Sequence, residues 1–378
     1  MWWDETGVDV DETAGIASPP SQPRITEPPL PDVTKKPNDT VEKAKIPEKV
    51  ITPEITAKAT STSDVLRCFG STPDQFKCYR EYYGELIAKD GAKPAIIDIK
   101  GRYADSFVKS QCHQLMHIIG RASADKYKTV AEAFQEGDPF CWSGYYHGVM
   151  EGVALHLGRE KLAQSLDIIC AGIPGKERFS FDYYNCVHGL GHGIMAILND
   201  ELMDTLAMCD NLSGSWEQSS CWSGAFMENI IANGIDHRSK YLKDNDPHYP
   251  CDAVDEKYKG VCYIMQTSRM LALTGYDFVR VYALCAAAEE PYINICYQSL
   301  GRDASGSTVS DVERTKAYCL LGKDNRQQSN CVIGAVKDFI SYFHSDKQAR
   351  EFCSALPEDL QSICTSTAES YYLSFRPS

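Results

Sequence analysis

The chain has 378 residues, 43% of them hydrophobic, and a formal net charge of −14 at pH 7. This length is ample for a sizeable buried core. The negative charge and the lack of a basic block argue against nucleic-acid binding. No apolar run of about eighteen residues occurs, so no membrane span is predicted. The first residues, MWWDETGVDVDET, lack the basic and apolar regions of a signal peptide, so an exported protein would need a signal or anchor upstream.

Residues 1–62 differ in composition from the rest of the chain. They contain nine of the 18 prolines and none of the 16 cysteines. Such a sequence buries too little apolar surface to offset the entropy lost on ordering, so we expect an extended, disordered tail. Residues 63–378 would then form one cysteine-rich helical domain. The tail suits a stalk between a membrane anchor and this domain, and it suits equally a merely variable terminus.

The spacing of the cysteines predicts a repeated disulfide. From Cys170 onward the cysteines fall in couples separated by 11 to 16 positions, and the second cysteines of successive couples are 33 to 41 residues apart. Cys68 and Cys78 form a further couple, which leaves Cys112 to pair with Cys141. The even count predicts no free thiol. The eight predicted disulfides are Cys68–Cys78, Cys112–Cys141, Cys170–Cys186, Cys209–Cys221, Cys251–Cys262, Cys285–Cys296, Cys319–Cys331 and Cys353–Cys364.

Each couple of cysteines has the same local context. The first cysteine ends an amphipathic run such as YDFVRVYALC, a polar turn follows, and the second cysteine begins another run such as CVIGAVKDFISYF. Apolar residues recur in these runs at three- and four-residue spacing, which is typical of helices. Two helices of about twelve residues in a period of about 35 predict an all-α fold. The specific prediction is a disulfide-stapled helix-turn-helix repeat solenoid, an α/α superhelix.

The period and the cysteine placement resemble those of cysteine-rich Sel1-like helical repeat proteins over residues 64–376. The resemblance implies the same architecture, with one disulfide for each helix pair. It implies no function, because the alanine and glycine consensus of those repeats is not matched.

A reduced, metal-binding cysteine set is the alternative to disulfides, and it requires close pairs such as CxxC. No such pair occurs, and the absence of CxxCH also removes covalently attached c-type haem. Disulfides form in oxidising compartments. We therefore expect an extracytoplasmic protein, whether secreted, periplasmic or at the cell surface.

The candidate site consists of histidines. Five of the nine histidines fall in three helical stretches, CHQLMHIIG, CWSGYYHGVMEG and CVHGLGHG, at matching places after a cysteine. A spacing of four residues puts both members of a pair on one helix face. Imidazoles and carboxylates on one face of adjacent helices can form a metal site. The predicted ligands are His113, His117, His147, His188, His192 and Glu151.

Five imidazoles favour zinc, copper or iron over calcium or magnesium. In a metal-dependent hydrolase, Glu151 or Glu228 is the expected catalytic base beside a metal-bound hydroxide, whereas copper or iron would support an oxidase. The alternative function is a non-catalytic cell-surface binding or metal-capture scaffold. The histidines could also form a metal-free binding or catalytic cluster, or a structural hydrogen-bonded network. An open coordination position in a cleft would favour the enzyme, and a closed site would favour capture.

Later repeats lack the histidines and carry charge at corresponding places, at Arg269, Arg302 and Lys337. If this face lines the concave side of the superhelix, a cationic stretch continues from the histidines. It would bind an anionic group of an unknown ligand or partner protein. An ordinary solvated face is the alternative.

Overall fold

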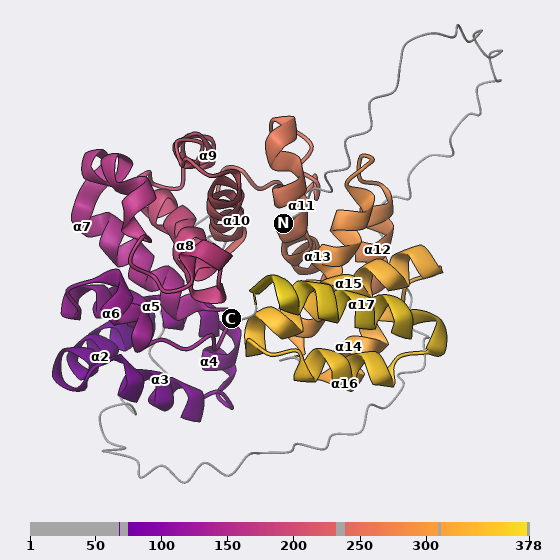
Figure 1. The fold of residues 1–378 in the computed structure, drawn as a ribbon, viewed down its shortest axis with the longest axis horizontal. Coiled ribbons are helices and arrows are strands. Elements are labelled where there is room, and N and C mark those ends of the chain that lie inside the picture. The colour runs from indigo at the N-terminus through magenta and orange to yellow at the C-terminus, as the bar shows by residue number, and fades with distance from the viewer. Residues whose placement is uncertain (1–67, 69–74, 232–238, 309–310, 376–378) are drawn as a thin grey trace, which may run out of the picture. The chain divides into compact units, whose positions relative to one another are not determined.

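The computed structural model describes residues 68, 75–231, 239–308 and 311–375. Within these ranges every regular element is a helix, which confirms the predicted all-α class (Figure 1). The chain divides into two units, Met1–Thr62 and Ser63–Ser378. The described residues all belong to the second unit, and the predicted tail, residues 1–62, lies outside them.

The helices follow one another with these bounds: α2 (Gln75–Asp90), α3 (Ala92–Gly101), α4 (Ser106–Ser110), α5 (Cys112–Lys126), α6 (Val130–Gln135), α7 (Gly144–Ile169), the 3₁₀ helix η2 (Lys176–Arg178), α8 (Phe181–Ile197), α9 (Leu202–Cys209), α10 (Ser215–Ile231), α11 (Glu256–Thr274), α12 (Phe278–Ala286), α13 (Ile293–Ser307), α14 (Val312–Cys319), α15 (Asn325–Phe343), α16 (Lys347–Ala355) and α17 (Glu358–Phe375).

Aspartate caps mark where several helices of the hairpins begin. The Asp277 side chain accepts a 3.1 Å hydrogen bond from the Arg280 backbone N–H at the start of α12, and Asp311 does the same for Arg314 in α14. Asp324 caps α15 in the same way. An aspartate at this position satisfies a backbone donor that the helix leaves unpaired. The helix–turn–helix units are therefore encoded locally.

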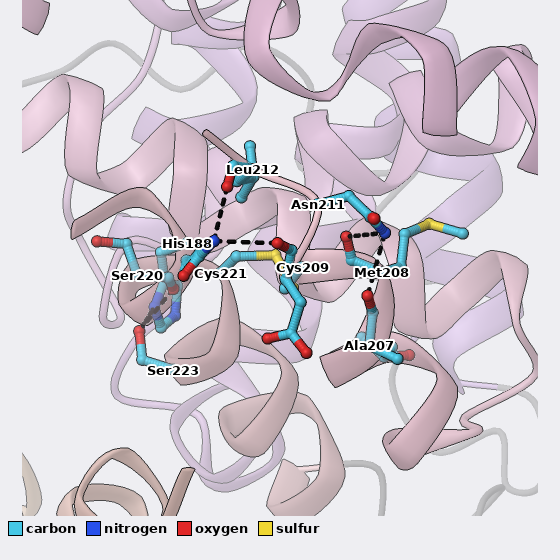
Figure 2. Close-up of a disulfide and its surroundings, with 12 residues drawn as sticks. His188, Ala207, Met208, Cys209, Asn211, Leu212, Ser220, Cys221 and Ser223 are labelled. Atoms are coloured by element: carbon cyan, nitrogen blue, oxygen red, sulfur yellow. Dashed lines mark hydrogen bonds between the residues drawn. A yellow bond between two sulfur atoms is a disulfide. The ribbon is translucent and has the colours of Figure 1, made fainter. Parts of the chain in front are cut away.

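All eight predicted disulfides are present, and none of the 16 cysteines is free. Figure 2 shows one of them, Cys209–Cys221, which joins α9 to α10. A glutamine three residues before the second cysteine closes the same turn. The Gln218 side-chain amide donates to the carbonyl oxygens of Asp210 and Leu212 at 3.0 and 2.7 Å. Gln328 repeats this contact on Gly322 at 2.7 Å.

The longer helices of successive hairpins pack against one another in chain order. Contacts run from α5 to α7, α8 and α10, and onward through α11, α13, α15 and α17. Met116 of α5, Val149 of α7 and Leu190 of α8 are fully buried. This order is the one that stacked hairpins require. Whether the stack forms a superhelical solenoid stays a prediction.

Glycines let the first helices approach closely. A Cβ atom at Gly148 would overlap the backbone carbonyl oxygen of His117, and one at Gly224 would overlap that of His188. The backbones of α5 and α7, and of α8 and α10, therefore pack closer together than helices with larger side chains there could.

The longest helix, α7, contains a break at Gly158, where φ is 69°, so it consists of two shorter helices. The first of these carries His147 and Glu151. No helix in the described part of the chain is long and apolar enough to cross a membrane.

Candidate metal centre

The five predicted histidines come together in the interior of the domain. His113 and His117 extend from α5, His147 from α7, and His188 and His192 from α8. None of the five is more than 8% exposed. Their ring centroids lie as close as 4.4 Å, for His147 and His192, and 6.4 Å separates the rings of His113 and His192. The register predicted from the sequence is correct, and we call these five residues the histidine cluster.

The two histidines of α5 face each other through their Nε2 atoms, which are 2.9 Å apart. Their Nδ1 atoms, on the opposite edge of each ring, both make hydrogen bonds. His113 Nδ1 donates to the backbone carbonyl of Cys141 at 2.8 Å, and His117 Nδ1 donates to Glu151 Oε1 at 2.6 Å. A carbonyl and a carboxylate oxygen only accept hydrogen bonds. Each ring therefore carries a hydrogen on Nδ1, and the neutral His113 presents an Nε2 lone pair to His117.

The two histidines of α8 repeat this arrangement, with their Nε2 atoms 3.2 Å apart. His192 Nδ1 donates to Glu228 Oε2 at 2.6 Å. His188 Nδ1 lies 2.7 Å from the Ser223 hydroxyl, which itself donates to the Ser220 carbonyl at 2.7 Å (Figure 2). Because that hydroxyl hydrogen is already used, Ser223 accepts the hydrogen bond and His188 Nδ1 donates it. The Nε2 of His188 is therefore left with a lone pair that faces His192.

Burial disfavours the protonated form of four rings of the cluster, those of His113, His147, His188 and His192. Burial, and then the neighbouring His117, lowers the pKa of His113 to about 3. Burial, and then the positive charge of Arg302, lowers the pKa of His188 to about 3. Removing a charged ring from water disfavours the protonated form. His113 and His188 are therefore neutral rings.

His147 lies between the two pairs. Its ring centroid is 5.2 Å from that of His113 and 4.7 Å from that of His188. Its Nδ1 atom is buried and has no hydrogen-bond partner among the described residues. Burial, and then His192, lowers its pKa well below the usual value. An unpartnered buried nitrogen in a polar cluster is uncommon and calls for a partner such as an ion.

The backbone before α7 is strained where it meets the cluster. Cys141, Trp142 and Ser143 have φ angles of 54°, 54° and 60°, in the left-handed region that non-glycine residues rarely occupy. Such a conformation persists only where its surroundings hold it. Here the disulfide to Cys112 and the hydrogen bond from His113 to the Cys141 carbonyl hold it.

Each histidine pair has one member whose Nδ1 contacts a glutamate. Glu151 contacts His117 through Oε1 and forms an ion pair with Arg121 through Oε2. Burial alone would raise the pKa of Glu151, but His117 and Arg121 hold it at about 2. Burial, and then the charge of Glu151, raises the pKa of Glu228 well above its usual value. Both glutamates thus lie beside the cluster, where the sequence placed them, and each contacts the Nδ1 side of a histidine.

Sequence reasoning missed Arg121, Ser223 and the Cys141 carbonyl. Arg121 follows His117 by four residues and therefore lies on the same face of α5 as His113 and His117. This spacing was visible in the sequence. Ser223 lies on α10 and reaches His188 only because α8 and α10 pack together. No spacing rule within either helix reveals that contact.

The side of the cluster nearest solvent is at His113. It is the most exposed of the five rings, and the Trp142 ring, 42% exposed, has its centroid 6.4 Å from that of His113. A cavity of about 30 Å³ lies here, lined by residues that include Cys112, Trp142 and Tyr342. That volume is enough for about one water molecule. The cluster is therefore shielded from solvent, and solvent comes nearest to it at Trp142.

The three predicted cationic side chains each have a polar partner. Arg269 pairs with Asp244, Arg302 pairs with Asp303 at 2.7 Å, and Lys337 donates to the Gln298 side chain at 3.2 Å. Arg302 also donates to the Ser268 hydroxyl at 2.7 Å. Binding of an anionic ligand or partner at these residues stays a prediction.

Comparisons of the chain with protein-family models, with curated proteins and with solved structures find no match in any of the three. The resemblance to Sel1-like repeats therefore stays a prediction.

Proposed function

We propose that this protein is an extracytoplasmic metalloprotein whose histidine cluster holds a transition metal, zinc, copper or iron, in a closed centre. Imidazole nitrogens suit these metals. The eight disulfides point to an oxidising compartment, since such bonds are rare where thiols are kept reduced. Secretion, a periplasmic location and attachment to a cell surface all satisfy this condition.

The observation that carries the proposal is the pair of facing Nε2 atoms on each of two helices. They are 2.9 Å apart in His113 and His117, and 3.2 Å apart in His188 and His192. Two nitrogens bound to one ion at a tetrahedral angle, with bonds of ~2.0–2.1 Å, lie about 3.3 Å apart. Both separations lie near this value. An ion between the two nitrogens of a pair would accept a lone pair from each, whereas a metal-free network needs a hydrogen on one of them.

The contacts behind the histidines also match those of metal ligands. A ligating histidine usually donates its other N–H to a carboxylate, a carbonyl or another acceptor, which fixes the ring and makes the free nitrogen a better ligand. His117 and His192 donate to glutamates, and His113 and His188 donate to a carbonyl and a hydroxyl. Four of the five rings are therefore oriented before any ion binds.

The closed surroundings favour metal capture or retention over turnover of a substrate. All five rings are nearly inaccessible, and the cavity near His113 has room for about one water molecule. Glu151 has both carboxylate oxygens engaged, by His117 and Arg121. A metal-dependent hydrolase or oxidase, with Glu151 or Glu228 as its base, stays a prediction that would need an opening of this cover.

Metal analysis tests the proposal directly. The full chain is produced in an oxidising compartment, purified without chelators or a nickel column, and analysed by plasma mass spectrometry. We expect stoichiometric zinc, copper or iron in the wild type and in His156→Ala, an exposed histidine that pairs with Asp125. We expect severe loss in His147→Ala at unchanged helical circular dichroism. A native protein without metal that also fails to bind added Zn²⁺ or Cu²⁺ would refute the proposal.

A further inference from the structure

The donor atoms of the five histidines, taken without the glutamates, form two groups rather than one. His113, His117 and His147 form a group in which every donor lies within 4.8 Å of the others, and His147, His188 and His192 form a second such group. An ion with bonds of ~2.1 Å can contact only donors that lie within about 4.2 Å of one another. The five rings as placed therefore suit two ion positions, one on each side of His147.

His147 is also the ring whose two nitrogens are both available. Each of the other four rings donates from Nδ1 to an acceptor outside the cluster. The Nδ1 of His147 has no hydrogen-bond partner among the described residues, although it is buried. The ring lies between the two pairs, 4.4 Å from His192 and 5.6 Å from His117 by ring centroids. A ring whose two nitrogens both lack hydrogen-bond partners can bind one ion through each nitrogen.

The two glutamates lie between the two groups, because donor atoms of His117, Glu151, His192 and Glu228 also lie within 4.8 Å of one another. Glu151 accepts from His117 in the first group, and Glu228 accepts from His192 in the second. Each position thus has one carboxylate that backs one of its histidines. A buried divalent ion needs such compensation, because an isolated charge is costly in the interior.

We propose that the centre holds two metal ions that share His147. One ion binds His113, His117 and one nitrogen of His147, and the other binds His188, His192 and the second nitrogen of His147. When the second ion binds, the N–H hydrogen of His147 leaves as a proton to solvent, and the ring bridges the ions as an imidazolate. The inference rests on the proposed metal-binding function and adds the number of ions and the shared ligand.

Copper titration of the metal-depleted full chain tests the inference. Cu²⁺ is the probe, bound copper is counted by plasma mass spectrometry, and its unpaired spins are counted by electron paramagnetic resonance. We expect two coppers per chain and a spin signal well below the copper content at low temperature, because a bridging imidazolate couples the two spins. Two coppers with full spin intensity would overturn the shared ligand.

Paired variants separate the two positions. His113→Ala and His188→Ala each remove one ligand from a different group and leave the other group of three intact. We expect each variant to bind one copper per chain with full spin intensity, and His156→Ala to behave as the wild type. Circular dichroism and the absence of free thiols check the fold of each variant. One copper per chain in the wild type would overturn the two-ion inference while the proposed function stands, whereas a chain that holds no native metal and binds neither Cu²⁺ nor Zn²⁺ would overturn both.

Discussion

The Nδ1–H of His188 donates a 2.7 Å hydrogen bond to the hydroxyl of Ser223, a residue 35 positions later in the chain. The contact joins α8 to α10, and the Nε2 of His188 lies 3.2 Å from that of His192. The Ser223 hydroxyl, together with the Tyr184 hydroxyl 3.2 Å from the same nitrogen, engages the Nδ1 of His188 and leaves its Nε2 available to an ion. Its removal provides a direct measure of how much such orientation contributes.

Ser223→Ala is expected to weaken metal binding by about 10–100-fold, the usual effect of losing a hydrogen-bond partner of a ligating histidine. Ser220→Ala is the matched control. Its hydroxyl donates to the Trp216 carbonyl, and only its backbone carbonyl, which the substitution keeps, serves Ser223. Competition with a chelator of known affinity measures the difference. Equal affinities for the two variants would show that Ser223 does not orient a ligand.

Glu228→Gln is expected to weaken metal binding by about 10–100-fold. Glutamine keeps an acceptor for the His192 Nδ1–H but removes the negative charge that compensates the ion. Glu217→Gln, on the same helix, is the control because the Glu217 carboxylate accepts from the Tyr183 hydroxyl rather than from a histidine. Calorimetric titration with Zn²⁺ distinguishes them. An affinity of Glu228→Gln that matches the control would contradict a role for this charge.

Loss of the Cys112–Cys141 disulfide is expected to affect both stability and metal binding. The bridge closes a 29-residue separation, and removing such a bridge costs about 3–4 kcal/mol in the chain-entropy model. It also frees the segment whose Cys141 carbonyl orients His113. The paired variant Cys112→Ser, Cys141→Ser should therefore unfold at lower denaturant concentration and bind metal more weakly.

The control for this disulfide is the pair Cys353→Ser, Cys364→Ser, which removes the bridge between α16 and α17. It should lose stability by a similar amount and keep the metal affinity of the wild type. Denaturant unfolding and metal titration are measured on both double variants. A metal affinity reduced equally in both would mean that the effect follows from general loosening of the fold and not from the position of Cys141.

Gly224→Ala is expected to separate α8 from α10. The added Cβ would overlap the backbone carbonyl of His188, so the helices must shift, which costs about 1–3 kcal/mol. Metal binding should weaken as His188 moves. Gly84→Ala, in α2 with open space around the new Cβ, should instead stabilise the protein by ~1 kcal/mol because alanine favours a helix. A Gly224→Ala protein as stable as the wild type would show that the interface is not tightly packed.

Much of this protein is determined by short-range sequence pattern. Cysteine couples 11 to 16 positions apart predict the disulfides of the later repeats, because residues at the two ends of one turn between helices must lie close together. The four-residue spacing of His113 and His117, and of His188 and His192, places both members of a pair on one helix face. The repeat register then aligns these faces. The all-α class, the disulfide pairing and the choice of the five histidines follow from these local rules.

The tertiary structure decides what each nitrogen contacts. The rotation and axial offset of packed helices bring Ser223 to His188 and Glu228 to His192. The same packing pairs Glu151 with Arg121, divides the donors into two groups that share His147, and closes the cluster to solvent. Helix periodicity specifies which residues share a face, but it does not specify the distance or rotation between two faces. Those depend on interlocking side chains and on glycines such as Gly148 and Gly224, where backbones of neighbouring helices nearly touch.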